Sequence, residues 1–534
     1  MDLIKLLAYT FTIFFRLPPI ARLIIVLVFI TQSIYFSILS FRFTTLWYGK
    51  LIRKRNKSNR FKLLENISNQ SQKTIIGFFH PYCNAGGGGE RVLWTAVAFH
   101  QRNHSNVICA IYTGDLGVTK EEMISKVKQR FNIDIELQSL ILVPLTSRYL
   151  LEASYWPRFT LLGQSLGSIV VGFEAINRLI PDVYIDTMGY AFTYPIFSSL
   201  AGIPIGAYVH YPTISTDMVK KVTNRQSAHN HSSIISNSFI LTHAKLLYYI
   251  LFAELYSNCL KQADNIMVNS TWTKRHIENL LKPSFYQSTI NSNSKKEIEI
   301  IYPPCDIKSF INFPLSSRHP IILSISQFRP EKDQIKQILS FSNFLKLNPN
   351  KPFKLILAGS CRDSEDEKRV EDLKKLVDQL GLQSKVEFKV NIDYNELKHL
   401  LSISSIGLST MVDEHFGISI VEFMASGLIP LVHASGGPLT DIIEEKVTGY
   451  FGTTIESYSQ QLNEITSTDQ IQLETLRENA RKISQEKFSE EVFEFEWDKV
   501  WNQLKDQKRG LKEELDKSWI PKSRLLGNES KKVD

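Results

Sequence analysis

The chain has 534 residues, of which 43% are hydrophobic and 22% charged, so it is long enough for two large domains and gives no sign of a long disordered portion. Eight basic residues and no acidic residue lie between Arg42 and Lys62, which accounts for the whole net charge of +8 and leaves little support for nucleic-acid binding. The five cysteines are scattered without a C-x-x-C, a pattern that fits a reducing compartment and predicts neither a disulfide framework nor a zinc site.

Near the amino terminus, residues 23–41 carry no charge and as a helix would be about 28 Å long, enough to cross a bilayer core. A signal peptide would have a shorter apolar part and a small-residue cleavage site, but Phe41-Arg42-Phe43 follows, so we expect a retained membrane anchor. More basic residues follow the run than precede it, so the chain beyond it is expected to be cytosolic. We assign residues 1–72 to this anchor and a basic juxtamembrane segment that would attract anionic lipid headgroups.

From residue 73 onward, short apolar strands alternate with helices, which predicts an α/β domain with a doubly wound parallel sheet. We place this first domain over residues 73–314. Strands are expected at 74–79, 107–112, 140–143, 183–186, 203–209 and 266–269, and helices at 91–101, 121–131 and 167–179.

A glycine-rich loop lies between the first predicted strand and helix and consists of Gly86, Gly87, Gly88 and Gly89. Strand, glycine loop and helix form the geometry of a phosphate cradle, because glycine lets a ligand approach the backbone closely. The loop is neither a P-loop, since no Gly-Lys-Ser/Thr closes it, nor a G-x-G-x-x-G fingerprint. A plain flexible turn is the alternative.

His210 follows the strand expected at 203–209, where the carboxyl edge of an open sheet faces a cleft. It could hydrogen-bond a bound sugar, or it could be a structural loop histidine. The polar stretch 219–238 is expected to be a mobile loop. The apolar stretch 239–260 is interrupted by Lys245 and Glu254, so we expect a helix on the membrane face or in the core rather than a second span.

A second α/β domain is predicted over residues 315–487, and a closing helix that packs back on the first domain, followed by a charged tail, over 488–534. After the strand at 320–326 come two cations, Arg329 and Lys332, which could meet a diphosphate. As ordinary surface charges they would have no such role. Further strands are expected at 353–359, 386–390, 405–409 and 429–433.

Two glutamates, Glu414 and Glu422, flank a helix that is expected to begin near Gly417. The free amides of Gly417, Ile418 and Ser419 and the positive end of the helix dipole make this helix start an anion site. A phosphate with a carboxylate on either side is typical of a bound sugar nucleotide. Two solvated helix glutamates are the alternative.

Residues 409–437, STMVDEHFGISIVEFMASGLIPLVHASGG, resemble the E-x7-E signature of the retaining GT-B glycosyltransferases of family four. The run HPYCNAGGGGERVLW at 80–94 is similar to the endoplasmic-reticulum α-1,2-mannosyltransferases of that family. The resemblance covers roughly residues 74–505. It implies a GT-B fold, with two Rossmann-like domains that face a cleft and, in this chain, follow a transmembrane helix.

The resemblance also implies an activity: transfer of mannose from GDP-mannose to dolichol-diphosphate-linked oligosaccharide, as the fourth and fifth mannoses, on the cytosolic face of the endoplasmic reticulum. It implies no metal or further cofactor, and an α product. Other mannosyltransferases of the pathway remain open as partners, and another linkage or nucleotide-sugar donor remains an alternative. An oxidoreductase would need a dinucleotide fingerprint, which is absent, and a membrane-tethered binding protein with an inactive site would release no GDP.

For the site, the resemblance implies that Glu414 contacts the donor hexose, Glu422 the ribose and His210 the transferred sugar. The glycine loop would lie near the donor phosphates and the acceptor. Lys332 matches the lysine with which the family binds the diphosphate. The matching arginine position is Gln327 here, so Arg329 is expected to substitute for it.

Overall fold

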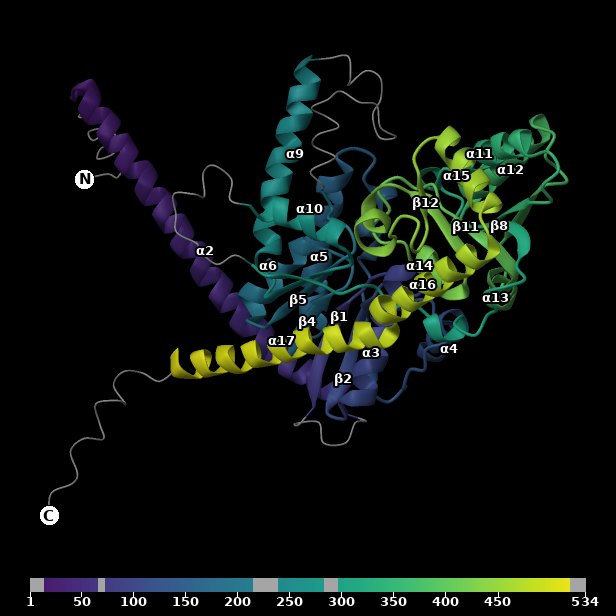
Figure 1. Cartoon of the computed structure of the whole chain (residues 1–534). Helices are drawn as coiled ribbons and strands as arrows, with labels where there is room; N and C mark the ends of the chain where they lie inside the picture. The colour runs from purple at the N-terminus through teal and green to yellow at the C-terminus, as the bar shows by residue number, and fades with distance from the viewer. Residues whose placement is uncertain (1–13, 66–72, 215–238, 283–295, 519–534) are drawn as a thin grey trace.

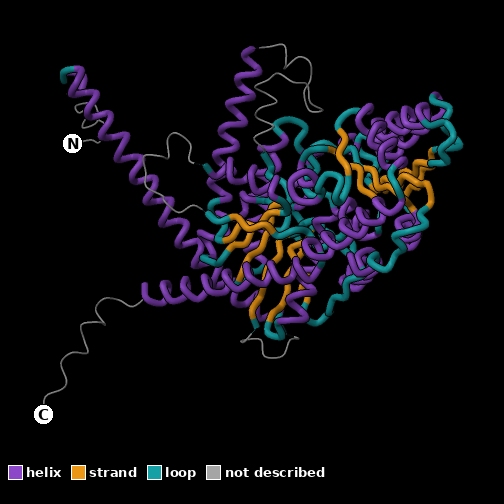
Figure 2. The backbone as a smooth tube through the Cα atoms, in the orientation of Figure 1, coloured by secondary structure: helices purple, strands orange, loops and turns teal. Residues whose placement is uncertain are grey.

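The structure, a computed structural model, describes residues 14–65, 73–214, 239–282 and 296–518. It contains two separate parallel sheets flanked by helices, with a long amino-terminal helix that projects from the first of them (Figure 1). Figure 2 shows the two groups of strands on either side of the middle of the molecule. The loop predicted at 219–238 lies outside the described residues.

The first sheet has seven strands in the order β3-β2-β1-β4-β5-β6-β7, and all their pairings are parallel. The chain order reverses between β1 and β4, and a crevice forms at such a switch point beyond the carboxyl ends of the strands. The elements of this half are β1 (Thr74–Phe79), α3 (Gly88–Asn103), β2 (Val107–Thr113), α4 (Lys120–Phe131), β3 (Leu140–Pro144), α5 (Thr160–Arg178), β4 (Val183–Asp186), β5 (Ile205–Val209), α9 (Phe239–Leu260), β6 (Asn265–Val268), α10 (Thr271–Leu281) and β7 (Ile298–Ile300).

The second sheet has six parallel strands in the order β10-β9-β8-β11-β12-β13, and its chain order reverses between β8 and β11. The same kind of crevice therefore opens in both halves. The elements here are β8 (His319–Ile325), α11 (Gln334–Leu347), β9 (Lys354–Gly359), α12 (Ser364–Gln379), β10 (Val386–Val390), α13 (Tyr394–Ile403), β11 (Ser404–Leu408), α14 (Ile418–Ser426), β12 (Ile429–His433), β13 (Tyr450–Gly452), α15 (Ile455–Ser467) and α16 (Gln470–Phe488).

Two helices begin earlier than the sequence predicts. The helix expected at 167–179 is α5, which begins at Thr160, because glycines in its first turns allow close packing: a Cβ at Gly163 would lie 2.4 Å from the Trp156 ring. The helix expected at 91–101 is α3, which begins at Gly88, because the Glu90 side chain folds back and accepts a hydrogen bond from the Gly87 amide. Tertiary packing and a capping contact therefore overcome the low helix propensity of glycine.

The chain crosses between the two halves twice, at one place. Cys305, on the way into the second half, donates its backbone N–H to the carbonyl of Phe488, on the way back, at 3.1 Å. The helix that follows, α17 (Glu490–Ser518), then packs on the first sheet, as expected for the closing helix, and Trp497 Nε1 donates to His100 Nε2 at 3.0 Å. Both ends of the described chain thus belong to the first half.

The amino-terminal helix, α2 (Pro19–Leu63), has 45 residues and continues without a break from the predicted anchor through the basic segment. It is the one helix in the described part of the chain that is long and apolar enough to cross a membrane, and its apolar window is not buried against the protein. The basic segment is not a loose linker. Arg60 forms an ion pair with Asp182 at 2.7 Å, and Asn56 bonds to backbone groups of Ile176 and Ile180, so the end of α2 is docked on the first domain.

Candidate functional site

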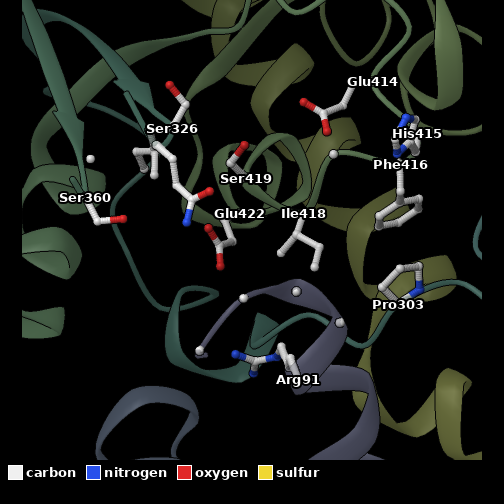
Figure 3. Close-up of a pocket in the computed structure, with 18 of the residues that line it drawn as sticks. Arg91, Pro303, Ser326, Ser360, Glu414, His415, Phe416, Ile418, Ser419 and Glu422 are labelled. Carbon is white, nitrogen blue, oxygen red and sulfur yellow. The ribbon is translucent and has the colours of Figure 1, made fainter. Parts of the chain in front are cut away.

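A cavity of about 490 Å³ lies between the carboxyl edges of the two sheets (Figure 3). Each sheet contributes the loops beyond its switch point, so segments far apart in sequence meet there. Of the residues that the sequence singled out, those that line this cavity are Gly86, Gly87, Gly88, Gly89, His210, Lys332, Glu414, Gly417, Ile418, Ser419 and Glu422.

Arg329 is not brought into this cavity. It lies just before the short 3-10 turn Pro330–Lys332, lines a different cavity beside α12, and places its Nη1 3.6 Å from Glu331 Oε1. Gln327, which occupies the arginine position of the family, does line the central cavity. The expectation that Arg329 substitutes for that arginine therefore has no geometric support.

Glu414 lies in the loop between β11 and α14, and its Oε2 is 2.7 Å from Lys332 Nζ. Both side chains are partly buried, and the same Nζ lies 3.0 Å from Met411 Sδ. The residue predicted to bind the sugar and the residue predicted to bind the phosphate are thus paired with each other. A bound anion could replace the carboxylate as the partner of the ammonium, and because both groups are partly exposed, the carboxylate would remain in contact with water or sugar hydroxyls.

The start of α14 is open as an anion site. Gly417 precedes the helix with a φ of 112°, which glycine adopts easily, and no side chain caps the first amides. In Figure 3 Glu414 and Glu422 approach the same space on either side of Ser419. Unpaired N–H groups at a helix start favour a phosphate, and the two carboxylates flank the place where it would bind.

Two glycines, Gly436 and Gly437, pack against the backbone of the loop that carries Glu414. Gly437 donates its N–H to the Glu414 carbonyl at 2.8 Å, and a Cβ at Gly436 would lie 2.2 Å from the same carbonyl oxygen. Gly436 also has a φ of 65°. Any side chain here would therefore displace the backbone of the loop that presents Glu414.

We expect Gly436→Ala to lower the melting temperature by several degrees and to reduce activity strongly, since a strained φ and a backbone clash act together. Gly381→Ala is the matched control, because Gly381 has nearly the same φ, 66°, but open space around it. Thermal unfolding and transfer assays of both variants check this. Equal losses in the two variants would mean that the clash with the Glu414 loop has no effect.

On the opposite wall, a buried network fixes the glycine loop. The Glu90 carboxylate accepts from the Gly87 amide and lies 3.2 Å from His80 Nε2, and His80 Nδ1 is 2.7 Å from Thr187 Oγ1. Burial raises the pKa of Glu90, but the bonds with His80 and the Gly87 amide outweigh it and leave the pKa below the usual value. A charged Glu90 therefore holds the loop against α3.

His210 lies beyond β5 as predicted, with Nε2 3.1 Å from the Thr187 carbonyl oxygen. Burial and the neighbouring His80 lower the pKa of His210 to about 4, so the ring is neutral at pH 7. Because Nε2 faces a carbonyl, it carries the proton, and Nδ1 is left as an acceptor. A neutral histidine of this tautomer can accept a hydrogen bond from a sugar hydroxyl.

Glu422 lies one helical turn beyond the start of α14 and faces the first domain. Burial raises its pKa to about 7, although the positive charge of Arg91 opposes the shift. Arg91 comes from α3, lies below Glu422 in Figure 3, and bonds to Glu490 at 3.0 Å. The carboxyl is thus poised to change its charge near neutral pH.

Several cavity residues were not singled out from the sequence. Ser326, Gly359 and Ser360 stand at the carboxyl ends of β8 and β9, and the strand-end argument that found His210 could have found them. Arg91 and Arg130 carry no such signal, because both lie on helices of the first domain and reach the cavity only through the packing of the two halves. In the part of the chain that the structure describes, no three His, Cys, Asp or Glu side chains lie close enough to hold a metal ion.

The two halves touch directly beside Glu414. The His415 ring stacks on Tyr211 at 4.1 Å between centroids, and Ser270 Oγ donates to the His415 carbonyl at 2.7 Å. The Thr271 amide donates to Asp441 at 3.0 Å. These contacts position the Glu414 loop against the wall that carries His210.

Comparison with known proteins agrees with this geometry. The family described as "ALG11 mannosyltransferase N-terminus" matches residues 73–281, and "Glycosyl transferases group 1" matches residues 307–483. The chain is 46% identical over 466 residues to the "GDP-Man:Man(3)GlcNAc(2)-PP-Dol alpha-1,2-mannosyltransferase" of Xenopus tropicalis, an alignment that covers 86% of this chain and 91% of that protein. The protein of the same name from Homo sapiens is 43% identical over 459 residues, or 84% of this chain and 90% of that one.

Among solved structures, a glycosyltransferase from Rickettsia africae ESF-5 superposes with a TM-score of 0.55 at 16% identity, over 81% of this chain and 98% of that one. At this identity the likeness shows the fold alone. Together with the two parallel sheets and the group 1 match, it confirms the predicted GT-B fold.

Proposed function

This chain belongs to the family of the GDP-Man:Man(3)GlcNAc(2)-PP-Dol alpha-1,2-mannosyltransferases, and we propose that it transfers mannose from GDP-mannose, in α-1,2 linkage, to dolichol-diphosphate-linked oligosaccharide. It is a glycosyltransferase, and the mannoses it adds are the fourth and the fifth. The observation that carries the proposal is the single cavity in which Glu414, the start of α14, Glu422 and Lys332 meet the glycine loop of the other half.

The diphosphate of the donor binds at the amides of Gly417–Ser419, where a helix start offers free N–H groups, and draws Lys332 away from Glu414. Glu414 then accepts hydrogen bonds from the mannose hydroxyls, and Glu422 from the ribose hydroxyls. The acceptor enters along the glycine loop, beside His210. No further cofactor or metal takes part.

In the reaction, the bond between the anomeric carbon and the β-phosphate oxygen breaks, and its electron pair leaves with GDP. Negative charge grows on the diphosphate, and Lys332 and the α14 amides stabilise it more in the transition state than in the bound donor. The acceptor hydroxyl attacks from the same face and gives its proton to the leaving phosphate, so the product keeps the α configuration. Neutral His210 orients a hydroxyl of the transferred mannose.

The protein is membrane-associated, and we place it in the membrane of the endoplasmic reticulum as a single-pass protein with both lobes in the cytosol. The support is the apolar stretch of α2 and the excess of basic residues that follows it. Endoglycosidase treatment checks the orientation: the Asn-x-Ser/Thr sites of the lobes, such as Asn103 and Asn269, should carry no glycan, and a shift of the protein band would contradict it.

The proposed function is tested with the purified full-length chain in lipid vesicles, given Man(3)GlcNAc(2)-PP-dolichol and a panel of nucleotide sugars. GDP-mannose should yield one GDP for each mannose transferred, in α-1,2 linkage. Transfer from a UDP-sugar instead would support a different glycosyltransferase. Binding of GDP-mannose without release of GDP would indicate a binding protein with an inactive site.

We expect the affinity for GDP to rise about tenfold from about pH 6 to about pH 8, because ribose hydroxyls donate to the ionised carboxylate and Glu422 has a raised pKa of about 7. Below that pKa the carboxyl is protonated and a poorer acceptor. Calorimetric titration with GDP at several pH values measures how steeply the affinity changes with pH. The terminal phosphate of GDP ionises near the same range, so Glu422→Gln, which cannot titrate, supplies the phosphate contribution. The same slope in both proteins would contradict a ribose role for Glu422.

A further inference from the structure

A cavity of about 460 Å³ lies in the second half of the molecule, at the end of the sheet opposite to the central cavity. It is enclosed by the amino-terminal ends of β8 and β11 on one side and by α15 and α16 on the other. Its wall includes Arg318, Ser405, Thr466 and Arg477. None of these residues lines the central cavity, to which the same sheet contributes the carboxyl ends of its strands. A molecule bound here would therefore not compete with a sugar nucleotide for space.

Arg477 brings a buried charge to this wall, since only 2% of the residue is exposed. Its Nη2 donates to Ser405 Oγ at 3.1 Å, but its Nε and Nη1 find no acceptor among the residues that the structure describes. A buried guanidinium with unbonded N–H groups is unfavourable, because nothing offsets the free energy of removing those groups from water. Since Arg477 lines the cavity, an anion bound there could accept these hydrogen bonds.

Two further arginines gather beside Arg477. Arg318 Nη2 donates to the carbonyl of Ser426, and Arg481 Nε donates to the carbonyl of Ala425, both at the end of α14. These partners are neutral, so the bonds do not cancel the positive charges. Burial and the charges of Arg477 and Arg481 lower the pKa of Arg318 to about 9, which leaves it a cation at pH 7. An anion beside Arg477 would reduce the repulsion among the three cations.

Hydroxyl groups supply most of the other polar atoms of the wall. The serines and threonines that line the cavity are Ser316, Ser317, Ser405, Thr466 and Thr468. Ser405 accepts from Arg477, so its own proton is free to be donated to an anion. One carboxylate, that of Glu474, also lines the cavity; it accepts from Gln470 Nε2 at 2.9 Å, and its charge opposes the lowering of the Arg477 pKa by burial. With two arginines against one glutamate, the charge of the wall is positive.

We propose that this cavity binds a small molecule through a phosphate group. We name it the arginine pocket; it is defined by Arg318, Ser405, Thr466 and Arg477. The planar guanidinium of arginine matches two oxygens of a phosphate, and the other oxygens can accept from the hydroxyls, whereas a carboxylate has only two oxygens to offer.

The volume of the arginine pocket is sufficient for a phosphate together with a small organic group. Inorganic phosphate and a phosphate monoester share the chemistry that the pocket recognises. The inference goes beyond the proposed function, because neither the mannose donor nor the dolichol-linked acceptor takes part in it.

The first test is calorimetric titration of the full-length chain, in a detergent without phosphate and with saturating GDP, with inorganic phosphate or glycerol phosphate at constant ionic strength. At least one of the two should bind with a Kd below about 1 mM, and Arg477→Lys, which keeps the charge but not the fork, should weaken that binding about tenfold. Arg362→Lys is the matched control, because Arg362 pairs with Asp366 at 3.3 Å and lines neither cavity.

Tighter binding of glycerol phosphate would assign the pocket to a monoester, and tighter binding of inorganic phosphate would assign it to the free ion. Absence of binding by both, or equal affinities in the two lysine variants, would overturn the proposal. The comparison between the variants reports on the arginine pocket even if GDP does not bind, so its outcome is separate from that of the proposed function.

Thermal unfolding supplies a second test, which separates a binding role of Arg477 from a purely structural one. The tighter of the two ligands, at about a hundred times its Kd, should raise the melting temperature of the unaltered chain by a few degrees, because it binds the folded state. Arg477→Met removes the cation and should show no such rise, whatever its melting temperature without ligand. An equal rise in both proteins would mean that Arg477 only supports the fold, and the proposal would be refuted.

Discussion

Replacing Glu414 with alanine is expected to lower mannose transfer by about a hundred- to a thousandfold, while the affinity for GDP changes little. The carboxylate is proposed to hold the mannose, a contact that GDP cannot make. Its loss also frees Lys332 from the ion pair at 2.7 Å, so the lysine remains available for the diphosphate. Transfer kinetics and GDP titration on the same preparation separate the two effects.

Two comparisons sharpen this result. Glu414→Gln keeps a hydrogen-bond acceptor and should retain more activity than the alanine variant. Glu331→Ala removes a glutamate that is adjacent to Lys332 in sequence but faces Arg329 and does not line the central cavity, and it should have no effect. A Glu414→Ala protein that transfers mannose normally, or that loses its GDP affinity to the same extent, would refute the assigned role.

Lys332→Ala is expected to have the other large effect: about a thousandfold slower transfer together with weaker GDP binding, by about tenfold. The lysine is proposed to neutralise charge that grows as GDP leaves, so its loss affects the transition state more than the bound nucleotide. Lys336→Ala is the matched control, because Lys336 pairs with Asp333 and does not line the cavity. A fall in affinity without a further fall in turnover would mean that Lys332 only binds the donor.

The two residues can also be tested together. Because Glu414 and Lys332 touch, their replacement should not be additive: the double variant should lose less activity than the product of the single losses. Strict additivity would indicate that the ion pair between Glu414 and Lys332 has no bearing on catalysis.

The fold was largely predictable, because both halves repeat strand and helix with apolar strands of ordinary length, and each predicted strand is found. The two three-residue strands β7 and β13, at the sheet edges, were not predicted. Glu414 and Glu422 could be assigned to one cavity because the sequence places them on either side of one helix start, and that helix start is the predicted anion site. Arg329 could not be placed in this way, since a single turn decides which side of the loop a residue faces.

Contacts between segments that are distant in the sequence could not be predicted. Nothing in the local sequence shows that a Cβ at Gly88 would meet Ile418 Cδ1 at 2.7 Å, since the two residues belong to different domains. Likewise, the basic run after the anchor was predicted only as a juxtamembrane segment that attracts lipid headgroups. The ion pair between Arg60 and Asp182 and the hydrogen bonds of Asn56 show that it is a docked helix. The number of basic residues in a stretch of sequence does not indicate which of them form ion pairs within the protein.

The two chain crossings at Cys305 and Phe488 lie side by side and share a hydrogen bond. Two lobes that are joined by two adjacent chain segments can move as rigid bodies chiefly by rotation about that hinge. Phe416 packs on Phe488, with the two ring centroids 5.5 Å apart, so the neighbouring His415 and its stacking on Tyr211 lie near this hinge. Product release would then widen most the parts of the cavity that lie farther from this contact, while the stacked rings stay close together.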